Sequence, residues 1–219
     1  MTDLTRISTS TFWLFCRTIK KDKLIMKQNI NKEVITIVSG LPRSGTSMLM
    51  KMLEAGGMKI LTDQIRTADE DNPKGYYEFE KVKELEKDTS WLQNAKGKAV
   101  KVISALLEHL PQNYSYKIIF IHRKIEEILA SQKQMLIRRG QPTDKVSDEE
   151  MKKIFLKHVQ QVEDWLANQS NIDVMYLYYN EILKEPVKYS ARINQFLGDI
   201  LNTKNMAGIV DKTLHRQRR

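Results

Sequence analysis

Residues 34–57 constrain the fold of this chain more than any other stretch of its sequence. They begin with an apolar, β-branched run at residues 34–38, which is typical of a buried strand. A loop that contains Gly40 and Gly45 follows, and residues 47–55 then place apolar side chains at helical spacing until two glycines end the predicted helix. A strand, a glycine-containing loop and a helix in this order predict an anion-binding site, because the loop N–H groups point inward and the helix N-terminus carries a partial positive charge.

The side chains of the loop indicate which kind of anion it binds. A nucleoside-triphosphate loop has the pattern G-x-x-x-x-G-K-[ST]. Gly40 and Gly45 have this spacing, but Thr46 stands at the lysine position and the cation, Arg43, lies inside the loop. A triphosphate enzyme without that lysine lacks its main contact to the outer phosphates. The loop therefore predicts a phosphate-type cradle that differs from a standard NTPase loop, whereas a turn without a ligand would need neither the cation nor the hydroxyl groups.

A second buried parallel strand is predicted at residues 116–123. It ends in His122 and Arg123, where many NTPases have a magnesium-binding aspartate, and this predicts a cationic nucleotide site without a metal ion. Ser131 lies two turns along the helix that follows, so its hydroxyl group and the Arg123 guanidinium can reach the same phosphate. The alternative for Arg123 alone is a surface arginine at the end of a strand.

The rest of the sequence alternates between strand and helix patterns and predicts one fold class. Strands are expected at residues 58–61, 98–104 and 173–178, and helices at 78–93, 126–139, 147–166 and 187–197. Ser147 and Glu150 form a predicted capping box. This order predicts an α/β chain with a three-layer, P-loop-like fold, in which helices flank a central parallel sheet. The ligand is expected at the carboxyl ends of the strands, beside the cradle.

Length and composition predict how the chain is divided. The 219 residues are enough for one domain, expected at residues 26–219 with a basic C-terminal tail. Residues 1–25 do not match the rest and are expected to be a disordered N-terminal extension. Their apolar side chains at Phe12, Trp13 and Phe15 leave a functional anchor as the alternative.

The net charge limits which partners the chain is expected to bind, and the cysteine content bears on its location. The net charge of +9 predicts an anionic partner, but the lysines alternate with acids and no basic helix carries interleaved aromatic residues, so nucleic acid is disfavoured. No apolar run of the sequence is long enough to span a bilayer. The single cysteine, Cys16, excludes an intrachain disulfide and is compatible with the cytoplasmic location that we expect.

The cradle sequence Pro42-Arg43-Ser44-Gly45-Thr46-Ser47 resembles the phosphosulfate-binding loop of the sulfotransferase family, P-[KR]-S-G-[TS]-[TS]. Arginine in the second place is similar to the Golgi and tyrosylprotein branch, since cytosolic enzymes have lysine there. In this family an arginine that ends a core strand and a serine eight residues later hold the 3′-phosphate of the nucleotide, and Arg123 and Ser131 occupy those places. The segment 174–198 also resembles the family, although Asn180 stands where the family has glutamate.

The resemblance implies an enzyme that uses 3′-phosphoadenosine 5′-phosphosulfate (PAPS) as donor and transfers its sulfuryl group to a hydroxyl or amine of an unidentified acceptor, without a metal ion. It implies that Arg43 and the loop amides stabilise the leaving group. The oxygens of this group are surrounded by Ser44, Gly45, Thr46 and Ser47. A basic C-terminal segment touches the 3′-phosphate in this family. Arg216 is therefore a candidate contact here, and a disordered basic tail is the alternative.

The general base is the least determined part of the site. The histidine of the cytosolic K-T-H motif is not recognisable near Lys101. Tyrosylprotein and heparan enzymes use a glutamate downstream of the loop, and Asp63 lies close to that place, which makes it the predicted base. The alternatives for the base are Asp69, Glu70 and His109.

Two other functions fit the same sequence. One is a nucleotide kinase or hydrolase with an atypical phosphate loop, which would bind triphosphate with magnesium. The other is a non-catalytic nucleotide-binding protein, which would bind the donor without transferring anything. Whichever function holds, the acidic and aromatic residues 69–78 lie shortly after the cradle, where they could hold an acceptor substrate of a transfer enzyme or form a solvated surface turn.

Overall fold

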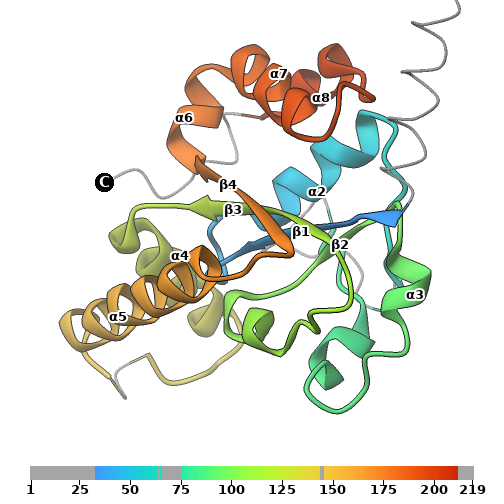
Figure 1. Cartoon of the computed structure of the whole chain (residues 1–219). Helices are drawn as coiled ribbons and strands as arrows, with labels where there is room; N and C mark the ends of the chain where they lie inside the picture. Colours follow the sequence, from blue (N-terminus) through green and yellow to red (C-terminus); the bar gives the residue numbers. More distant parts are fainter. Residues whose placement is uncertain (1–32, 64, 66–74, 144–145, 212–219) are drawn as a thin grey trace, which may run out of the picture.

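A computed structural model describes residues 33–63, 65, 75–143 and 146–211. Four parallel strands form one sheet in the order β2-β1-β3-β4 (Figure 1). Their bounds are β1 (Ile35–Gly40), β2 (Ala99–Lys101), β3 (Tyr116–His122) and β4 (Ile172–Tyr178). Gly40 at the end of β1 lies opposite Ile121 of β3, so the cradle follows directly beside the carboxyl end of β3. The predicted α/β class and central parallel sheet are confirmed.

Helices cover both faces of the sheet. Their bounds are α2 (Thr46–Ala55), α3 (Leu92–Ala95), α4 (Ile125–Arg138), α5 (Asp148–Ala167), α6 (Tyr179–Lys184), α7 (Pro186–Phe196) and α8 (Thr203–Gly208), with 3-10 helices η1 (Glu80–Glu84) and η2 (Ser104–His109). The first face is packed by α2, α6, α7 and α8, and the second by η1, α3, η2 and α5 (Figure 1). Helix α4 contacts α5 and leads away from the carboxyl end of β3.

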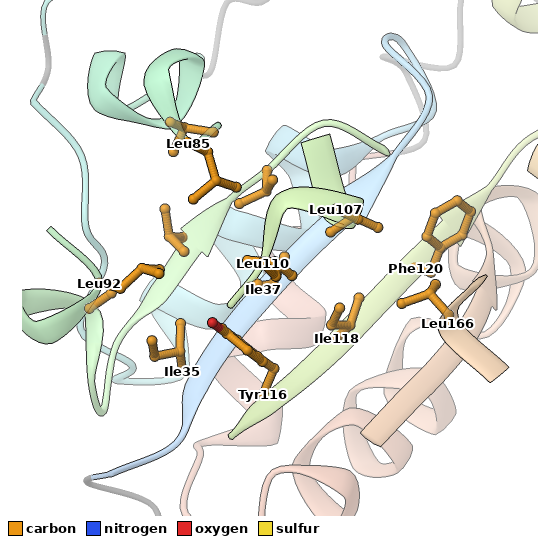
Figure 2. Close-up of a cluster of buried hydrophobic side chains, with 14 of the residues drawn as sticks. Ile35, Ile37, Leu85, Leu92, Leu107, Leu110, Tyr116, Ile118, Phe120 and Leu166 are labelled. Carbon is orange, nitrogen blue, oxygen red and sulfur yellow. The ribbon is translucent and has the colours of Figure 1, made fainter. Parts of the chain in front are cut away.

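The strands reach both layers because successive side chains point to opposite faces. Ile35 and Ile37 of β1 face the η1–α3–η2–α5 layer, where Figure 2 shows them in one cluster with Ile118 and Phe120 of β3. Val38 instead packs with the α2 layer. All are fully or almost fully buried, and each contributes on the order of 1.5–3 kcal/mol relative to exposure. The rigid sheet so formed fixes where its carboxyl ends lie.

The predicted helix at residues 78–93 is wrong as a continuous element. The structure has η1 and α3 instead, separated at Asp88–Ser90, where the Ser90 N–H donates to Asp88 Oδ1 at 2.8 Å. Such a local side-chain turn competes with helical hydrogen bonding. The predicted strand at residues 58–61 is reduced to a single parallel bridge between Ile60 and Ala99.

The capping box at the start of α5 is confirmed, because the Glu150 N–H donates to Ser147 Oγ and the Ser147 N–H donates to Glu150 Oε2, each at 3.2 Å. Within the described ranges, no helix has both the length and the apolar character needed to cross a membrane. The predictions for residues 1–25 and for Asp69, Glu70 and Arg216 fall outside the described residues.

Candidate active site

The cradle turns tightly at two glycines that no other residue could replace without movement. Gly40 has a φ of +150°, and a Cβ there would lie 2.5 Å from the carbonyl oxygen of Ile121. Gly45 has a φ of +111°, and a Cβ there would lie 2.5 Å from Cδ2 of Tyr179. Both distances are far below van der Waals contact, so the two glycines allow the loop to pass between β3 and α6.

Arg43 is held in a strained backbone conformation at the centre of this loop. Its φ of 72° places a non-glycine residue in the left-handed region, which costs on the order of 1 kcal/mol. Its side-chain Nε donates to Ser131 Oγ of α4 at 3.0 Å, and its carbonyl oxygen accepts a hydrogen bond from Nη1 of Arg123 at 3.1 Å. Three predicted site residues from distant parts of the sequence therefore lie in one cluster.

Arg123 is fixed by Glu127 and Tyr179, in addition to the Arg43 carbonyl oxygen. Its Nε lies 2.8 Å from Glu127 Oε2, and the two side chains are 8% and 1% exposed. The second carboxylate oxygen of Glu127 accepts a hydrogen bond from Asn180 Nδ2 at 2.8 Å. The guanidinium carbon lies 4.5 Å from the ring centroid of Tyr179. A buried, paired and stacked arginine at a strand end is positioned in advance for an anion.

Tyr179 joins the cluster to the cradle, because the same ring that stacks on Arg123 limits the space at Gly45. Burial raises the pKa of the Tyr179 hydroxyl, and the nearby Arg123 charge opposes that rise only in part. The ring is therefore neutral at neutral pH, and its flat face remains available for stacking.

Ser44 places a hydroxyl group in the cradle with its side chain completely buried. Among the described residues its Oγ has no hydrogen-bond partner. A buried hydroxyl without a partner costs about 1–3 kcal/mol, so an anion held in the cradle would satisfy it. This is the behaviour expected of a residue that contacts a ligand.

Lys101 brings a further cation to the cradle from the end of β2. Its Nζ donates to the Tyr76 carbonyl oxygen at 2.5 Å and lies 3.4 Å from Glu78 Oε1. The same Tyr76 oxygen accepts a hydrogen bond from Ser47 Oγ at 3.3 Å. The ammonium group is thus near the first turn of α2, where an anion bound in the cradle would lie.

Asp63 has a structural role in the segment that precedes η1. Its Oδ2 accepts the Glu80 N–H at 2.5 Å and its Oδ1 accepts the Ile65 N–H at 3.1 Å. Its use as a general base stays a prediction. His109 lies at the end of η2 with its Nε2 4.0 Å from Glu108 Oε1. Across the described residues, no three His, Cys, Asp or Glu side chains are grouped as a metal site.

The family model of the sulfotransferase domain matches residues 35–217. The chain belongs to this sulfotransferase family. The family that the cradle motif resembles is therefore confirmed.

A solved sulfotransferase structure shares the fold of this family member, and a second was also matched. Sulfotransferase STF1 from Mycobacterium tuberculosis is 14% identical, with 85% of this chain and 74% of that chain covered at a TM-score of 0.52. Mouse sulfotransferase SULT7A1 complexed with PAP is 23% identical, with 82% and 63% covered at a TM-score of 0.47. The chain thus spans less than two thirds of the mouse enzyme. The match to STF1, at 14% identity, supports the fold alone. A search of curated proteins found no significant match.

Three residues around the sulfotransferase cluster were missed by sequence reasoning: Glu127, Asn180 and Tyr179. The spacing of Arg123 and Glu127 was a usable signal, because a residue just before a helix can pair with one four positions later in its first turn. Asn180 and Tyr179 could not be placed this way, since their contacts join α6 to a segment more than fifty residues earlier in the chain.

Proposed function

We propose that this protein transfers the sulfuryl group of PAPS to a hydroxyl or amine of an acceptor. The observation that carries the proposal is the cluster of Arg43, Ser131 and Arg123 beside the glycine cradle. A donor with charged groups at both the 5′ and the 3′ positions needs two anion sites on a single surface. The cradle and the Arg123–Ser131 pair supply two such sites.

The donor would bind with its phosphosulfate in the cradle. Loop N–H groups and the start of α2 favour negative charge there, and the Ser44 hydroxyl is available as a donor. The 3′-phosphate would meet the Arg123 fork and the Ser131 hydroxyl. Ser131 accepts from Arg43 through a lone pair, so its own proton remains available to donate to a phosphate oxygen.

The reaction is an in-line displacement at sulfur. The acceptor oxygen or nitrogen forms a bond to sulfur, the bond from sulfur to the 5′-phosphate oxygen breaks, and its electron pair leaves with adenosine 3′,5′-bisphosphate. The acceptor proton passes to a general base. Negative charge grows on the 5′-phosphate, where Arg43, Lys101 and the loop amides would stabilise it.

We include in the proposal that the transfer needs no metal ion, because these fixed cations can stabilise the charge that grows on the 5′-phosphate. A cytoplasmic location, supported by the single cysteine of the sequence, is part of the proposal too. Fractionation of cells that express the full chain would test the location.

The test combines binding and transfer on the full chain. Adenosine 3′,5′-bisphosphate is titrated with EDTA present, and ATP is titrated with magnesium in parallel by calorimetry. Sulfur-labelled PAPS is then incubated with a panel of phenols, alcohols and amines. Bisphosphate binding without magnesium and labelled product are expected. Preferential binding of ATP with magnesium would favour the kinase alternative, and donor binding without product from any acceptor would favour a non-catalytic protein.

A further inference from the structure

The first two residues of helix α6 both contact the buried Arg123–Glu127 pair. Helix α6 begins directly after β4, which pairs with β3 up to its last residue, so its first turn lies beside the carboxyl end of β3 (Figure 1). Tyr179 places its ring centroid 4.5 Å from the guanidinium carbon of Arg123. Asn180, which is half-buried, donates from Nδ2 to Glu127 Oε1 at 2.8 Å. Tyr179 thus contacts the cation of the pair, whereas Asn180 contacts its carboxylate.

Glu127 divides its two carboxylate oxygens between two donors. Its Oε2 accepts the Nε–H of Arg123 at 2.8 Å, and its Oε1 accepts the amide of Asn180. A guanidinium and a carboxylate commonly form a bidentate pair instead, in which both oxygens meet two parallel N–H groups. On Arg123 the N–H group parallel to that of Nε belongs to Nη2. Because Asn180 occupies Oε1, the hydrogen bond between these two described residues runs from Nε and is not bidentate.

The divided carboxylate leaves the outer edge of the Arg123 guanidinium for another anion. One N–H of Nη1 donates to the carbonyl oxygen of Arg43 at 3.1 Å. The N–H groups of Nη2 and the other N–H of Nη1 form the remaining edge, and a phosphate binds such a planar fork through two oxygens. If Glu127 turned Oε1 toward Nη2, its carboxylate would compete with the phosphate for the same N–H groups.

The neutral amide of Asn180 is suited to holding Glu127 in place. An amide N–H donates to a carboxylate at any pH, whereas a carboxyl group donates only while it is protonated. A second carboxylate beside Glu127 would also be repelled by it. The family motif has glutamate at this place, so the amide departs from that motif. The other ionisable side chains around this turn are Arg43, Asp211, Glu181 and Tyr189.

We propose that Asn180 is a positioning residue for the 3′-phosphate of the donor, because its hold on Glu127 Oε1 keeps the carboxylate from closing on Nη2 of Arg123. The inference rests on the proposed sulfuryl transfer, whose donor carries that phosphate. Asn180 acts through Glu127 and Arg123. Its effect is on selectivity: a guanidinium edge that no carboxylate covers distinguishes a nucleotide with a 3′-phosphate from one without it.

The first experiment measures this selectivity by calorimetry on the full chain. Adenosine 3′,5′-bisphosphate and 5′-AMP are titrated against wild type, Asn180→Leu and Asn94→Leu. Leucine has nearly the shape of asparagine but cannot donate to Glu127. Asn94→Leu is the matched control, because Asn94 is exposed in α3, which precedes β2 and therefore lies at the amino ends of the strands, away from the cradle.

Asn180→Leu should lower the preference for the bisphosphate by about tenfold, the equivalent of one hydrogen bond to a charged group, while 5′-AMP binds as it does to wild type. Asn94→Leu should match wild type for both nucleotides. An unchanged preference in Asn180→Leu would overturn the positioning role, and so would an equal loss of both nucleotides. Failure of wild type to bind the bisphosphate, or to prefer it over 5′-AMP, would instead overturn the proposed function.

The second experiment restores the contact with a proton. Asn180→Asp keeps the shape of the side chain, and the carboxyl group can donate to Glu127 only when it is protonated. Two carboxyl groups in contact hold one proton to a higher pH than an isolated carboxyl group does. At about pH 8 the variant should therefore lose the preference as Asn180→Leu does, and at about pH 5 it should return to within about threefold of wild type.

Wild type is measured at the same two pH values, because the 3′-phosphate itself takes up a proton in this range. Damage to the fold would not be reversed by acid, so the recovery separates positioning from packing. A preference that Asn180→Asp retains in full at the higher pH, or a loss that persists at the lower pH, would contradict the role of Asn180.

Discussion

Replacing Glu127 with glutamine perturbs the contact that positions Arg123. The two side chains are 1% and 8% exposed and their nearest atoms are 2.8 Å apart, so this is a buried ion pair. Removing one member of such a pair leaves an uncompensated charge and costs about 3–5 kcal/mol. A typical total stability is about 5–15 kcal/mol, so this loss should lower the urea concentration at the unfolding midpoint substantially.

The neighbouring residue supplies the control. Glu126 pairs with Lys152 at 2.7 Å, but these side chains are 48% and 36% exposed, and exposed pairs contribute about 0–1 kcal/mol. Glu126→Gln should therefore change the urea unfolding midpoint very little.

A double-mutant cycle gives the decisive number for the pair. Arg123→Met combined with Glu127→Gln removes both charges, so the double variant should be more stable than the sum of single losses predicts, by about 1–3 kcal/mol. Equal costs for Glu126→Gln and Glu127→Gln, or a strictly additive cycle, would refute the argument that burial makes this pair important.

Three further variants test other parts of the structure. Gly45→Ala should abolish bisphosphate binding in calorimetry, because its Cβ would lie 2.5 Å from the Tyr179 ring. Gly57→Ala is the control and should retain binding, because its backbone strain is similar but its Cβ would have no atom within 4 Å. Asp63→Asn should lower stability by about 1 kcal/mol with kcat retained, because the amide nitrogen cannot accept one of the two backbone hydrogen bonds that the carboxylate accepts. A kcat loss of about 10²–10⁴-fold would instead mark Asp63 as the base. Burial lowers the pKa of His122, so the unfolded chain binds the proton more readily than the folded chain does. The wild-type unfolding free energy should therefore fall as pH drops below 6.5. His122→Gln should remove this pH dependence in urea titrations at several pH values. A slope that persists in the variant would show that other groups cause it.

The β1–cradle–α2 unit could be predicted from sequence because each of its signals is local. The strand, the glycine spacing and the helical periodicity all lie within residues 34–57 and agree with one another. The family followed from the same hexapeptide, and Arg123 and Ser131 followed from their spacing after the next long strand. In the structure both residues contact Arg43.

The parts that sequence reasoning missed depend on contacts between distant segments. Asn180, in α6 directly after β4, donates a hydrogen bond to Glu127 of the Arg123–Glu127 pair, and no pattern around residue 180 indicates that contact. A cavity of about 280 Å³ forms where the cradle, β3, α4 and α5 meet, so His122 could be recognised as a strand-end cation but not as a cavity residue. The break between η1 and α3 depends on one Asp88–Ser90 turn, which a favourable helical periodicity obscured.

The central claim is that Arg123 holds the 3′-phosphate of the donor, and one thermodynamic cycle tests it. Adenosine 3′,5′-bisphosphate and 5′-AMP are titrated against wild type, Arg123→Lys and the exposed control Arg192→Lys. A hydrogen bond to a charged group contributes about 1.5–3 kcal/mol, so wild type and the control should prefer the bisphosphate by about 10- to 150-fold. Arg123→Lys should lose most of that preference while binding 5′-AMP as wild type does. Equal wild-type affinity for the two nucleotides, or an equal loss of both in Arg123→Lys, would contradict the account.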